Sequence, residues 1–575
     1  MTIGNWILSA AKRADQLAVQ FKKDHEWHSI TWADYLQKVT AAYGQLKKAG
    51  LQAQMHVGLI SNTRWEWSAL DLAVLGGGGV FVPFYPNLSD DDFLYSINHS
   101  EVEILIVESD ELFEKITGLQ KKFEKKVKLF KLDEIKFDGA VSEKLKKEFH
   151  VSCSSIKNHD VATIIYTSGT TGKPKGVVML HEAIVSEVSE GYRLFSLKPT
   201  YKALTFLPFA HVLGRIEHWG SLYSGHSLAY AESIEKLRGN LLEIKPDFII
   251  AVPRIFEKVY GGIMAQIETN KIKQTLFSEA IAAAEEVHKY RQTKSTLPWS
   301  LLLKYEALNR VAFGPIRAAF GGNLKFAVSG GAPLARELTQ FFFNCGIPVL
   351  EGYGLSETCG AITINSLNDY EIGTVGKPIG EVQIKIAEDG EILIKSKKCL
   401  KEYYKNPEDT AKSIQDSYFA TGDIGEFTSR GFLKITDRKK DLIKTAGGKY
   451  VAPQKLEGLL KQDSLISQVL IHGDQKKYIV ALITLDEVSL ERWADSNNIK
   501  YDKLSDLAEN LALKMRVQKH VQGVNASLAS FESIKKFEIL SDSWSIENGA
   551  LTPSLKVKRK FLEAKYAPLL KEIYD

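Results

Sequence analysis

Residues 164–178, which read IIYTSGTTGKPKGVV, constrain the fold of this 575-residue chain more than any other stretch. A short apolar run with strand character, 161–166, leads into residues that are almost all glycine, hydroxyl or lysine. Glycine lets backbone N–H groups approach an oxyanion, and hydroxyl and ammonium groups supply further donors and positive charge. Five residues beyond Gly169 stands Pro174, where a Walker A loop needs its second glycine, so that class of loop is excluded. The stretch predicts a phosphate-binding loop after a buried strand.

Segments with helix and strand character alternate along the first hundred residues. Apolar or small residues recur at helical spacing over 31–50, between a capping pattern and a glycine, which predicts an amphipathic helix. The apolar runs 56–60, 79–84 and 102–108 predict buried strands, and 65–75 predicts a helix between the first two. This alternation favours an α/β arrangement with a largely parallel sheet.

The composition indicates a globular chain of two or more domains, with 44% apolar and 25% charged residues. The formal net charge of +4 is small for this length and argues against nucleic acid as a partner. Lysines nevertheless cluster in 121–131 and 144–149. Such runs are typical of solvated helix faces, and the alternative is contact with an anionic membrane surface.

Cysteine usage and terminal composition bear on the cell compartment. The four cysteines are widely spaced without a CxxC pair, which indicates neither a zinc site nor a disulfide framework. The first residues lack the organisation of a signal peptide, and no apolar run approaches about 18 to 20 residues, the length needed to span a membrane. We therefore expect a cytoplasmic enzyme, with peripheral contact at the inner face of a membrane as an option.

The segment TSGTTGKPKG resembles the signature loop of the adenylate-forming superfamily, which contains acyl-CoA synthetases, luciferases and the adenylation domains of peptide synthetases. In that family the loop is mobile and wraps the β- and γ-phosphates of ATP. The resemblance therefore implies ATP as substrate and pyrophosphate as product. The ATP-binding residues that it implies in this loop are Thr167, Ser168, Gly169, Thr170, Thr171, Gly172 and Lys173.

Two further glycine-containing turns follow predicted strands. In 325–334, Gly330 and Gly331 let the backbone approach a flat ligand such as adenine. The segment EGYGLSETCG, 351–360, provides a carboxylate, Glu357, which beside a triphosphate requires a cation and is therefore a natural Mg²⁺ ligand. The resemblance implies the same role for Glu357, together with Thr170. Further nucleotide contacts that it implies are Gly331, Ala332, Pro333, Glu351, Gly352, Tyr353, which lies against adenine, Gly354 and Ser356.

Two segments, around residues 423 and 438, offer contacts for ribose. Asp423 is an acceptor-only side chain that we place on a tight turn, where it suits two ribose hydroxyls. The resemblance implies the same role for Asp423, places a hinge at Asp437 and directs Arg438 to the ribose. The chain departs from the family pattern at Glu402, where relatives commonly have glycine, which puts the local turn in question.

Residues 206–219 contain two histidines seven positions apart. On a helix His211 and His218 would share one face, but the spacing is not that of HExxH and predicts no metal site. The family carries a Pro-x-x-His segment beside the acyl pocket, which 208–211 matches. Arg254 follows another strand at the sheet edge where α/β proteins bind ligands. The resemblance, which is closest to the long-chain fatty acid branch, implies an acyl pocket of His211, Arg254 and Gly330.

The last 139 residues, 437–575, suffice for a small independent domain, in which 468–473 and 478–485 predict a hairpin between helices. Near the end, Lys556 matches the family's catalytic lysine, although Ser-Leu-Lys stands where relatives often have Ser-Gly-Lys. A second loop, with Gly447, Gly448 and Lys449, is expected to replace that lysine during a later coenzyme A step. The predicted fold is a large multi-subdomain N-terminal α/β domain, 1–436, and a small mobile α+β C-terminal domain that turns at Asp437.

These motifs predict a ligase that activates a carboxylic acid with ATP and Mg²⁺ through an acyl-adenylate and transfers the acyl group to coenzyme A. A long-chain fatty acid is the favoured substrate. Alternatives are an acyl-AMP ligase that loads a carrier protein, a medium-chain or aryl acyl-CoA ligase, and an inactive nucleotide-binding homologue. The expected catalytic residues are Lys556, Glu357, Lys173 and His211.

Overall fold

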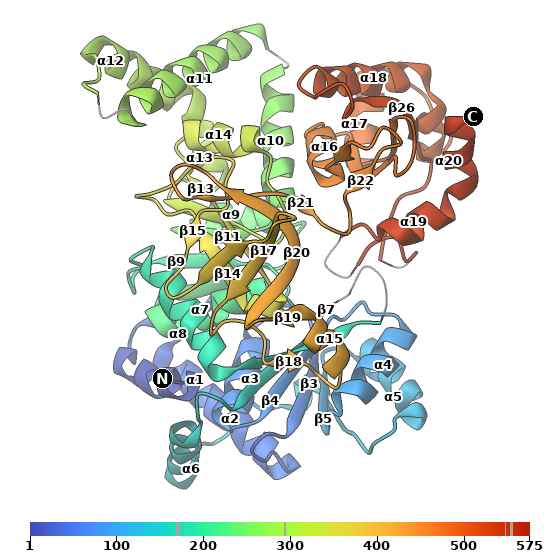
Figure 1. The fold of residues 1–575 in the computed structure, drawn as a ribbon. Helices are drawn as coiled ribbons and strands as arrows, with labels where there is room; N and C mark the ends of the chain where they lie inside the picture. Colours follow the sequence, from blue (N-terminus) through green and yellow to red (C-terminus); the bar gives the residue numbers. More distant parts are fainter. Residues whose placement is uncertain (168–172, 269, 293–294, 547, 553–555) are drawn as a thin grey trace.

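The computed structural model describes the chain except for residues 168–172, 269, 293–294, 547 and 553–555. A large N-terminal part carries two extended sheets and a smaller one, and the C-terminal residues form a separate lobe beside it (Figure 1). The mixed α/β class with a large and a small domain is therefore confirmed.

The first sheet has the strand order β18-β8-β7-β4-β3-β5-β6. Its inner strands pair in parallel, whereas β7 and β8 form an antiparallel hairpin. Its strands are β3 (His56–Ile60), β4 (Val80–Phe84), β5 (Ile104–Val107), β6 (Lys128–Lys131), β7 (Val161–Thr167), β8 (Lys175–Leu180) and β18 (Glu402–Tyr403). The predicted strands and the parallel sheet are confirmed.

The second sheet has the order β15-β14-β13-β12-β11-β9-β10-β1-β2 and is parallel from β13 to β1. Its strands are β1 (Leu17–Lys23), β2 (Glu26–Thr31), β9 (Lys202–Thr205), β10 (Ser227–Tyr230), β11 (Phe248–Ala251), β12 (Phe326–Ser329), β13 (Val349–Leu355), β14 (Gly360–Ile364) and β15 (Lys377–Pro378). A smaller antiparallel sheet is made of β16 (Gln383–Ile386), β17 (Glu391–Lys395), β19 (Ile414–Gln415), β20 (Tyr418–Phe427) and β21 (Leu433–Arg438).

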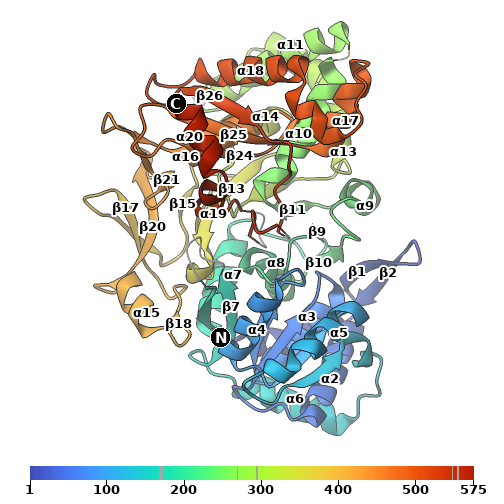
Figure 2. The same cartoon turned by 90° about the vertical axis from the view of Figure 1, so that its right-hand side faces the viewer.

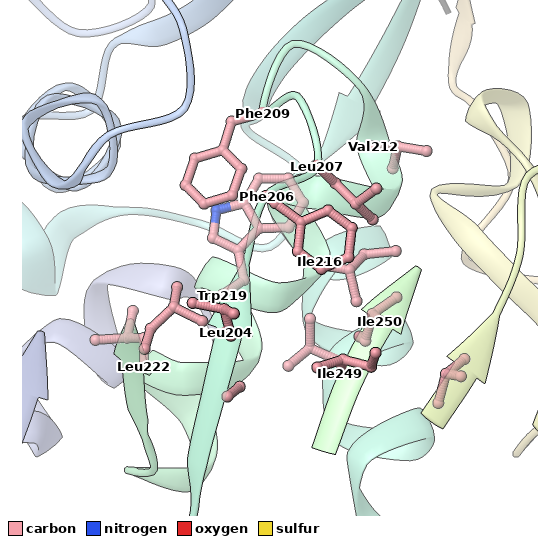
Figure 3. Packing of buried hydrophobic residues seen from close by; sticks show 14 of the residues in the cluster. Leu204, Phe206, Leu207, Phe209, Val212, Ile216, Trp219, Leu222, Ile249 and Ile250 are labelled. Carbon is pink, nitrogen blue, oxygen red and sulfur yellow. The ribbon is translucent and has the colours of Figure 1, made fainter. Parts of the chain in front are cut away.

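One layer of helices contributes to the main core together with strands of both extended sheets. The predicted helix 31–50 is confirmed: Thr31 caps α2, and Gly50 ends it at a φ of 105°. These helices are α1 (Ile3–Ala10), α2 (Trp32–Ala49), α3 (Trp65–Gly76), α6 (Glu143–Ser155), α7 (His181–Arg193) and α8 (Val212–Ser224). Figure 3 shows side chains of α8, β9 and β11 meeting in this core, beneath the loop that leads to α8.

Other helices cover the outer faces of the sheets. Residues of α4 and α5 share an apolar cluster with β3, β4 and β5, and residues of α10 and α14 pack against the second sheet. The helices α11 and α12 form a hairpin that projects from the body (Figure 1). Their bounds are α4 (Asp90–Ser100), α5 (Asp110–Leu119), α9 (Leu237–Ile244), α10 (Pro253–Glu268), α11 (Lys271–Gln292), α12 (Trp299–Leu308), α13 (Gly314–Ala319), α14 (Arg336–Asn344) and α15 (Pro407–Ser413).

The C-terminal lobe has apolar clusters of its own, whose buried members lie between Ile443 and Ile573 in the described part of the chain. β24 and β25 form the predicted antiparallel hairpin, flanked by α16 and α17, and β26 pairs in parallel with β25. The bounds are β22 (Ile443–Lys444), β23 (Tyr450–Val451), β24 (Ile466–His472), β25 (Ile479–Leu485), β26 (Ile534–Ile539), α16 (Pro453–Leu460), α17 (Glu487–Ser496), α18 (Leu511–Asn525), α19 (Arg559–Lys565) and α20 (Ala567–Tyr574). None of the described helices is long and apolar enough to cross a bilayer.

Candidate active site

A cavity of about 1060 Å³ lies where the C-terminal lobe meets the large domain. The carboxyl ends of β12 and β13, the end of β7 and the segment after β21 contribute its walls, as expected for a ligand site in an α/β protein. Predicted site residues that line it are Thr167, Lys173, His211, Gly330, Gly331, Gly352, Tyr353, Gly354, Ser356, Glu357, Arg438 and Lys556.

The predicted phosphate-binding loop is the connection of the β7–β8 hairpin. Thr167 pairs with Lys175 at the end of its stem. The ammonium group of Lys173 lies 4.9 Å from the centroid of the Tyr95 ring, and that of Lys175 forms an ion pair of 2.6 Å with Asp409. The predicted contacts Ser168, Gly169, Thr170, Thr171 and Gly172 lie outside the described residues.

Tyr353, Asp423 and Arg438 form one hydrogen-bonded group at the cavity. The Tyr353 hydroxyl donates to one oxygen of Asp423 at 2.6 Å, and Nε of Arg438 donates to the other at 3.0 Å. Asp423 lies within the long strand β20, not on the tight turn that the sequence predicts, and Gly422 before it takes a φ of 72°. The irregular register between β20 and β21 lets this strand bend at the site, which makes a separate turn unnecessary.

Glu357 is held by a tyrosine from a distant segment. Residues 356–358 form a short 3₁₀ turn after β13, and the Tyr403 hydroxyl donates to Oε1 of Glu357 at 3.0 Å. Tyr403 belongs to β18, which pairs with β8 beside the phosphate-loop stem. Glu402, where relatives commonly have glycine, does not disturb this strand pairing, because Glu402 itself pairs with Val178.

Lys556 and His211 meet the cavity from opposite domains. Lys556 is accessible to solvent there. Desolvation by the protein around the cavity lowers the pKa of its ammonium group, and the charge of Arg438 lowers it further. Burial, with a smaller effect from Lys556, lowers the pKa of His211 to about 4, so its imidazole is neutral at physiological pH. Nδ1 of His211 accepts the N–H of Leu213 at 3.2 Å, which leaves the proton on Nε2.

The turn after β12 brings backbone close to the cavity. Gly331 takes a φ of 82°, and Gly330 donates its N–H to the carbonyl of Ala251. The Oγ of Ser329, which also lines the cavity, is buried without a hydrogen-bond partner among the described residues.

Some predicted contacts lie away from the cavity. Glu351 is buried behind it and accepts a hydrogen bond from Thr339, and burial raises the pKa of its carboxyl to about 7. Ala332 and Pro333 are exposed and do not line the cavity. Arg254 begins α10 at the sheet edge, as predicted, but its guanidinium group lies 3.7 Å from Asp486 of the C-terminal lobe and does not line the cavity.

The two histidines of 206–219 do not share a helix face. His211 is the N-cap of α8 and therefore precedes its first turn, whereas His218 is buried inside the helix layer. His218 and Trp219 contact one oxygen of Asp71, and Arg215 forms an ion pair with the other. The described residues contain no cluster of three or more metal-ligating side chains.

The loop predicted for the coenzyme A step lies outside the cavity. Gly447, Gly448 and Lys449 are exposed on the turn between β22 and β23. Asp437, the predicted hinge, is buried in β21 and pairs with Ile424, and its Oδ2 has no partner among the described side and main chains. Desolvation raises the pKa of this carboxyl to about 7.

The sequence reasoning missed several residues that support the site. It singled out neither Tyr403 nor the Lys175–Asp409 pair, whose segments are far apart in the chain. It also missed the buried pair of Asp71 and Arg215, since nothing in the local pattern relates α3 to α8. The adjacent tyrosines of the motif KEYYKNP were the available signal for Tyr403.

A second and larger cleft, of about 1760 Å³, opens beside the first. The two share Tyr85 and Ala210 as lining residues, so this part of the wall is one residue thick. Thr63 anchors the wall by donating to the carbonyl of Leu207 and accepting the N–H of Phe209. The end of the cavity near His211 thus lies next to a second opening.

Two known protein families match the chain, each over one part of it. Residues 8–404 match the model of the AMP-binding enzyme family, and residues 440–575 match that of the AMP-binding enzyme C-terminal domain. The chain belongs to the AMP-binding enzyme family. Its resemblance to the adenylate-forming superfamily, and to the long-chain acyl-CoA ligase branch, is confirmed.

This AMP-binding enzyme is 36% identical over 573 residues to long-chain-fatty-acid–CoA ligase FadD15 of Mycobacterium bovis, and the match covers 98% of the chain and 95% of the relative. It is 29% identical to peroxisomal long chain acyl-CoA synthetase 7 of Arabidopsis thaliana, over 96% of the chain and 82% of that relative. Its fold matches the o-succinylbenzoate CoA synthetase of Bacillus subtilis in complex with its acyl-adenylate intermediate, with a TM-score of 0.70, 20% identity and coverage of 97% and 98%.

The cavity of this AMP-binding enzyme combines three chemical functions. Lys173 and Lys556 provide cations for negative charge, Glu357 provides a carboxylate for a divalent ion, and the Tyr353–Asp423–Arg438 group offers aromatic surface and acceptors. Such a set of groups suits a nucleotide and its phosphates.

Proposed function

We propose that the protein joins a long-chain fatty acid to coenzyme A, using ATP and releasing AMP and pyrophosphate through an acyl-adenylate. The observation that carries the proposal is the convergence of Lys556, from the C-terminal lobe, with Glu357 and Arg438 in one cavity. The full-length similarity to FadD15 supports the choice of fatty acid and coenzyme A.

The first half of the reaction activates the carboxylate. A carboxylate is a poor acyl donor because its leaving group would be oxide, whereas an acyl-adenylate has a stable phosphate as leaving group. Attack of the carboxylate oxygen on the α-phosphorus of ATP forms that mixed anhydride and releases pyrophosphate. Negative charge grows on the phosphoryl oxygens during this step, and we assign its stabilisation to Lys173 and Lys556, which line the cavity.

The donor set at Glu357 fits a Mg²⁺ ion. Glu357 lines the cavity with Oε1 oriented by Tyr403, and a hard cation prefers such oxygen ligands together with phosphate oxygens. Glu357 and Thr170 would hold the ion, which supplies electrostatic stabilisation of the phosphates when bound.

The remaining contacts orient the nucleotide and the acid. Tyr353 and the turn at Gly331 provide surfaces for adenine, and Asp423, together with Arg438, serves the ribose hydroxyls. Neutral His211 lines the cavity, as Gly330 does, and we assign its Nε2–H to a hydrogen bond with the acid's carboxylate. This donor orients the acid without adding a charge.

The second half requires a different arrangement. A thiol must reach the acyl carbon while Lys556 occupies part of the cavity, so we propose that the lobe 437–575 turns about Asp437 and withdraws this lysine. The loop with Gly447, Gly448 and Lys449 then takes its place. That loop is part of the lobe and is exposed to solvent, so it can move when the lobe turns.

The test is formation of coenzyme A thioesters across carboxylic acids from acetate to long-chain and aromatic ones. We expect the highest kcat/KM with long-chain acids. ATP–pyrophosphate exchange without thioester formation would indicate a carrier-protein acceptor, and absence of exchange with every acid would indicate an inactive nucleotide-binding homologue. Either result contradicts the proposal.

A further inference from the structure

Exposed large apolar side chains gather on the helical hairpin α11–α12. Of the 20 such side chains in the described part of the chain, six lie between residues 272 and 311, a span of 40 residues. Trp299 is the most exposed of the 20, at 75%. We call these six the hairpin surface: Ile272, Leu276, Trp299, Leu302, Leu303 and Val311.

The hairpin is a folded and anchored element. Its inner side is buried, with Phe277 packed against Phe313 and Phe341 of neighbouring elements. On the outer side, Trp299 and Leu303 lie one helical turn apart on α12, as Ile272 and Leu276 do on α11. Figure 1 shows that the hairpin projects from the body. The exposed apolar residues are therefore carried by a projecting element that is anchored in the core.

Positive charge surrounds these residues. Between positions 271 and 317 the sequence has eight lysines and arginines and four glutamates, an excess equal to the formal net charge of +4 of the whole chain. Lys304 pairs with Glu279, which joins the two helices, whereas Lys271, Lys273 and Arg310 form no ion pair within the described residues. The surface thus combines apolar side chains with uncompensated cations.

We propose that the hairpin surface docks on an anionic lipid bilayer. Tryptophan and leucine on a helix with flanking lysine and arginine are the combination that binds at the interface of anionic membranes. A projecting element can enter a lipid interface, whereas stable protein partners usually meet over broad complementary surfaces. Docking would bring the enzyme to the place where long acyl chains concentrate.

The earlier lysine runs are weaker candidates for such contact. Within them, Lys125 pairs with Glu101, Lys131 with Asp110 and Lys146 with Glu143, so much of their charge is compensated locally. The second run belongs to α6, which lies at the opposite end of the molecule from α11 in both views (Figures 1 and 2).

The C-terminal lobe extends the docking end of the molecule. Its helix α18 lies at the same end as α11 in both views (Figures 1 and 2), with Leu511 73% and Met515 62% exposed. These residues are also one helical turn apart. A bilayer that contacts the hairpin surface would therefore lie close to α18 as well.

The experiment is co-sedimentation of the full-length protein with vesicles of phosphatidylcholine and phosphatidylglycerol. The wild type should bind these vesicles, bind pure phosphatidylcholine more weakly, and release in about 1 M salt, where screening shortens the Debye length to about 3 Å. Trp299→Ser/Leu303→Ser should weaken partitioning by about tenfold per side chain, since each loses apolar burial. Lys271→Glu/Lys273→Glu should weaken it at least about fivefold per charge.

Matched controls are available elsewhere on the surface. Val151→Ser/Leu194→Ser removes exposed apolar side chains and Lys121→Glu/Lys122→Glu reverses exposed charges, and both should bind as the wild type does. All variants should retain the far-UV circular dichroism and the thermal unfolding midpoint of the wild type, which shows that they are folded. Brominated lipids should quench wild-type fluorescence more than that of Trp299→Phe.

Three results would overturn the proposal. They are failure of the wild type to bind the anionic vesicles, equal loss of binding in hairpin and control variants, and a concentration-dependent dimer that the wild type forms and Trp299→Ser/Leu303→Ser does not form. The last would assign the hairpin surface to a second copy of the chain. None of these results involves catalysis, so the docking proposal and the proposed function fail separately.

Discussion

The C-terminal lobe carries two lysine-bearing segments with opposite surroundings. The segment with Lys556 reaches into the cavity, where burial and the charge of Arg438 lower the pKa of its ammonium group and the large-domain carboxylates of Asp423 and Glu357 act in the opposite direction. The turn with Lys449 is exposed and stabilises itself, since Thr445 Oγ1 donates to the carbonyl of Lys449 and accepts its N–H. One segment depends on the large domain for its environment, and the other needs no contact with it.

This difference has a mechanistic consequence. The carboxylates of Glu357 and Asp423, which favour the charged form of Lys556, belong to the large domain, so Lys556 loses them when the lobe turns. A turn held by its own hydrogen bonds keeps its shape in any orientation. We infer that Lys556 serves only the arrangement described here, which is the one for adenylate formation. The Lys449 turn is then a preformed element for a second arrangement.

Removing the Lys556 ammonium group should have the largest effect. Lys556→Ala should slow adenylate formation by about 10² to 10³, the usual loss for one preorganised charge donor in a transition state. Thioester formation from supplied acyl-adenylate should stay within about threefold of the wild type. ATP–pyrophosphate exchange measures the first step, and release of AMP from supplied acyl-adenylate with coenzyme A measures the second.

The neighbouring Lys558 provides the control, because it lies two residues away and does not line the cavity. Lys558→Ala should leave both steps unchanged. A comparable loss of both steps in Lys556→Ala would contradict the division of labour.

The turn between β22 and β23 should show the reverse pattern with a smaller loss. Gly448 takes a φ of 73°, so Gly448→Ala strains the turn at a cost of about 1 kcal/mol or more, and Lys449→Ala removes its charge. Each should slow thioester formation by about tenfold and leave pyrophosphate exchange unchanged. Single-turnover kinetics separate the steps, and slowed exchange in either variant would argue that the turn already acts in the first arrangement.

Tyr403→Phe should produce a smaller effect, confined to the first step. The variant loses the hydrogen bond to Glu357, a contact worth about 1 kcal/mol, so exchange should fall about fivefold. Because the carboxylate is then less well oriented, the Mg²⁺ concentration needed for half-maximal exchange should rise. Tyr404→Phe is the matched control, since its hydroxyl bonds to Glu101 instead. An unchanged Mg²⁺ requirement would contradict the positioning role of Tyr403.

Features that depend on local sequence were predictable. The strand before the phosphate loop, the turn at Gly330 and Gly331, and the hairpin of β24 and β25 follow from apolar periodicity and glycine placement, which act over a few residues. The positions of Glu357 and Lys556 followed from motifs, and the structure brings both to one cavity.

Features that depend on long-range packing were not predictable. The hydrogen bond from Tyr403 to Glu357 requires β18 to pair with β8, more than 200 residues away in the chain. Arg254 lies at the predicted sheet edge, but its side chain turns to Asp486, a contact that exists only because the lobe docks there. Strand patterns give the place of a residue in a sheet, whereas the direction of a long side chain is set by its partners.

Substitution of Asp437, the proposed hinge residue, should have the smallest effect on activity and should change how stability depends on pH. Desolvation raises the pKa of Asp437 to about 7 in the folded protein, against about 3.9 in an unfolded chain. Between about pH 3.9 and pH 7 the unfolded state has released the carboxyl proton of Asp437, whereas the native state keeps it. The free energy of unfolding therefore falls as pH rises in this window, by up to about 1.4 kcal/mol per pH unit. Asn cannot titrate, and Asp437→Asn should therefore become progressively more stable than the wild type from pH 5 to pH 8.

Thermal unfolding of both proteins across that range measures the difference, with the exposed Asp502→Asn as a control that should follow the wild type. Both half-reactions of Asp437→Asn should stay within about threefold of the wild type, because the side chain does not line the cavity. Parallel stability profiles for Asp437→Asn and wild type would show that Asp437 is ionised in the fold at neutral pH. The desolvation of the buried Oδ2, which has no partner among the described residues, would then be offset by the Arg438 N–H and the charge of Arg559.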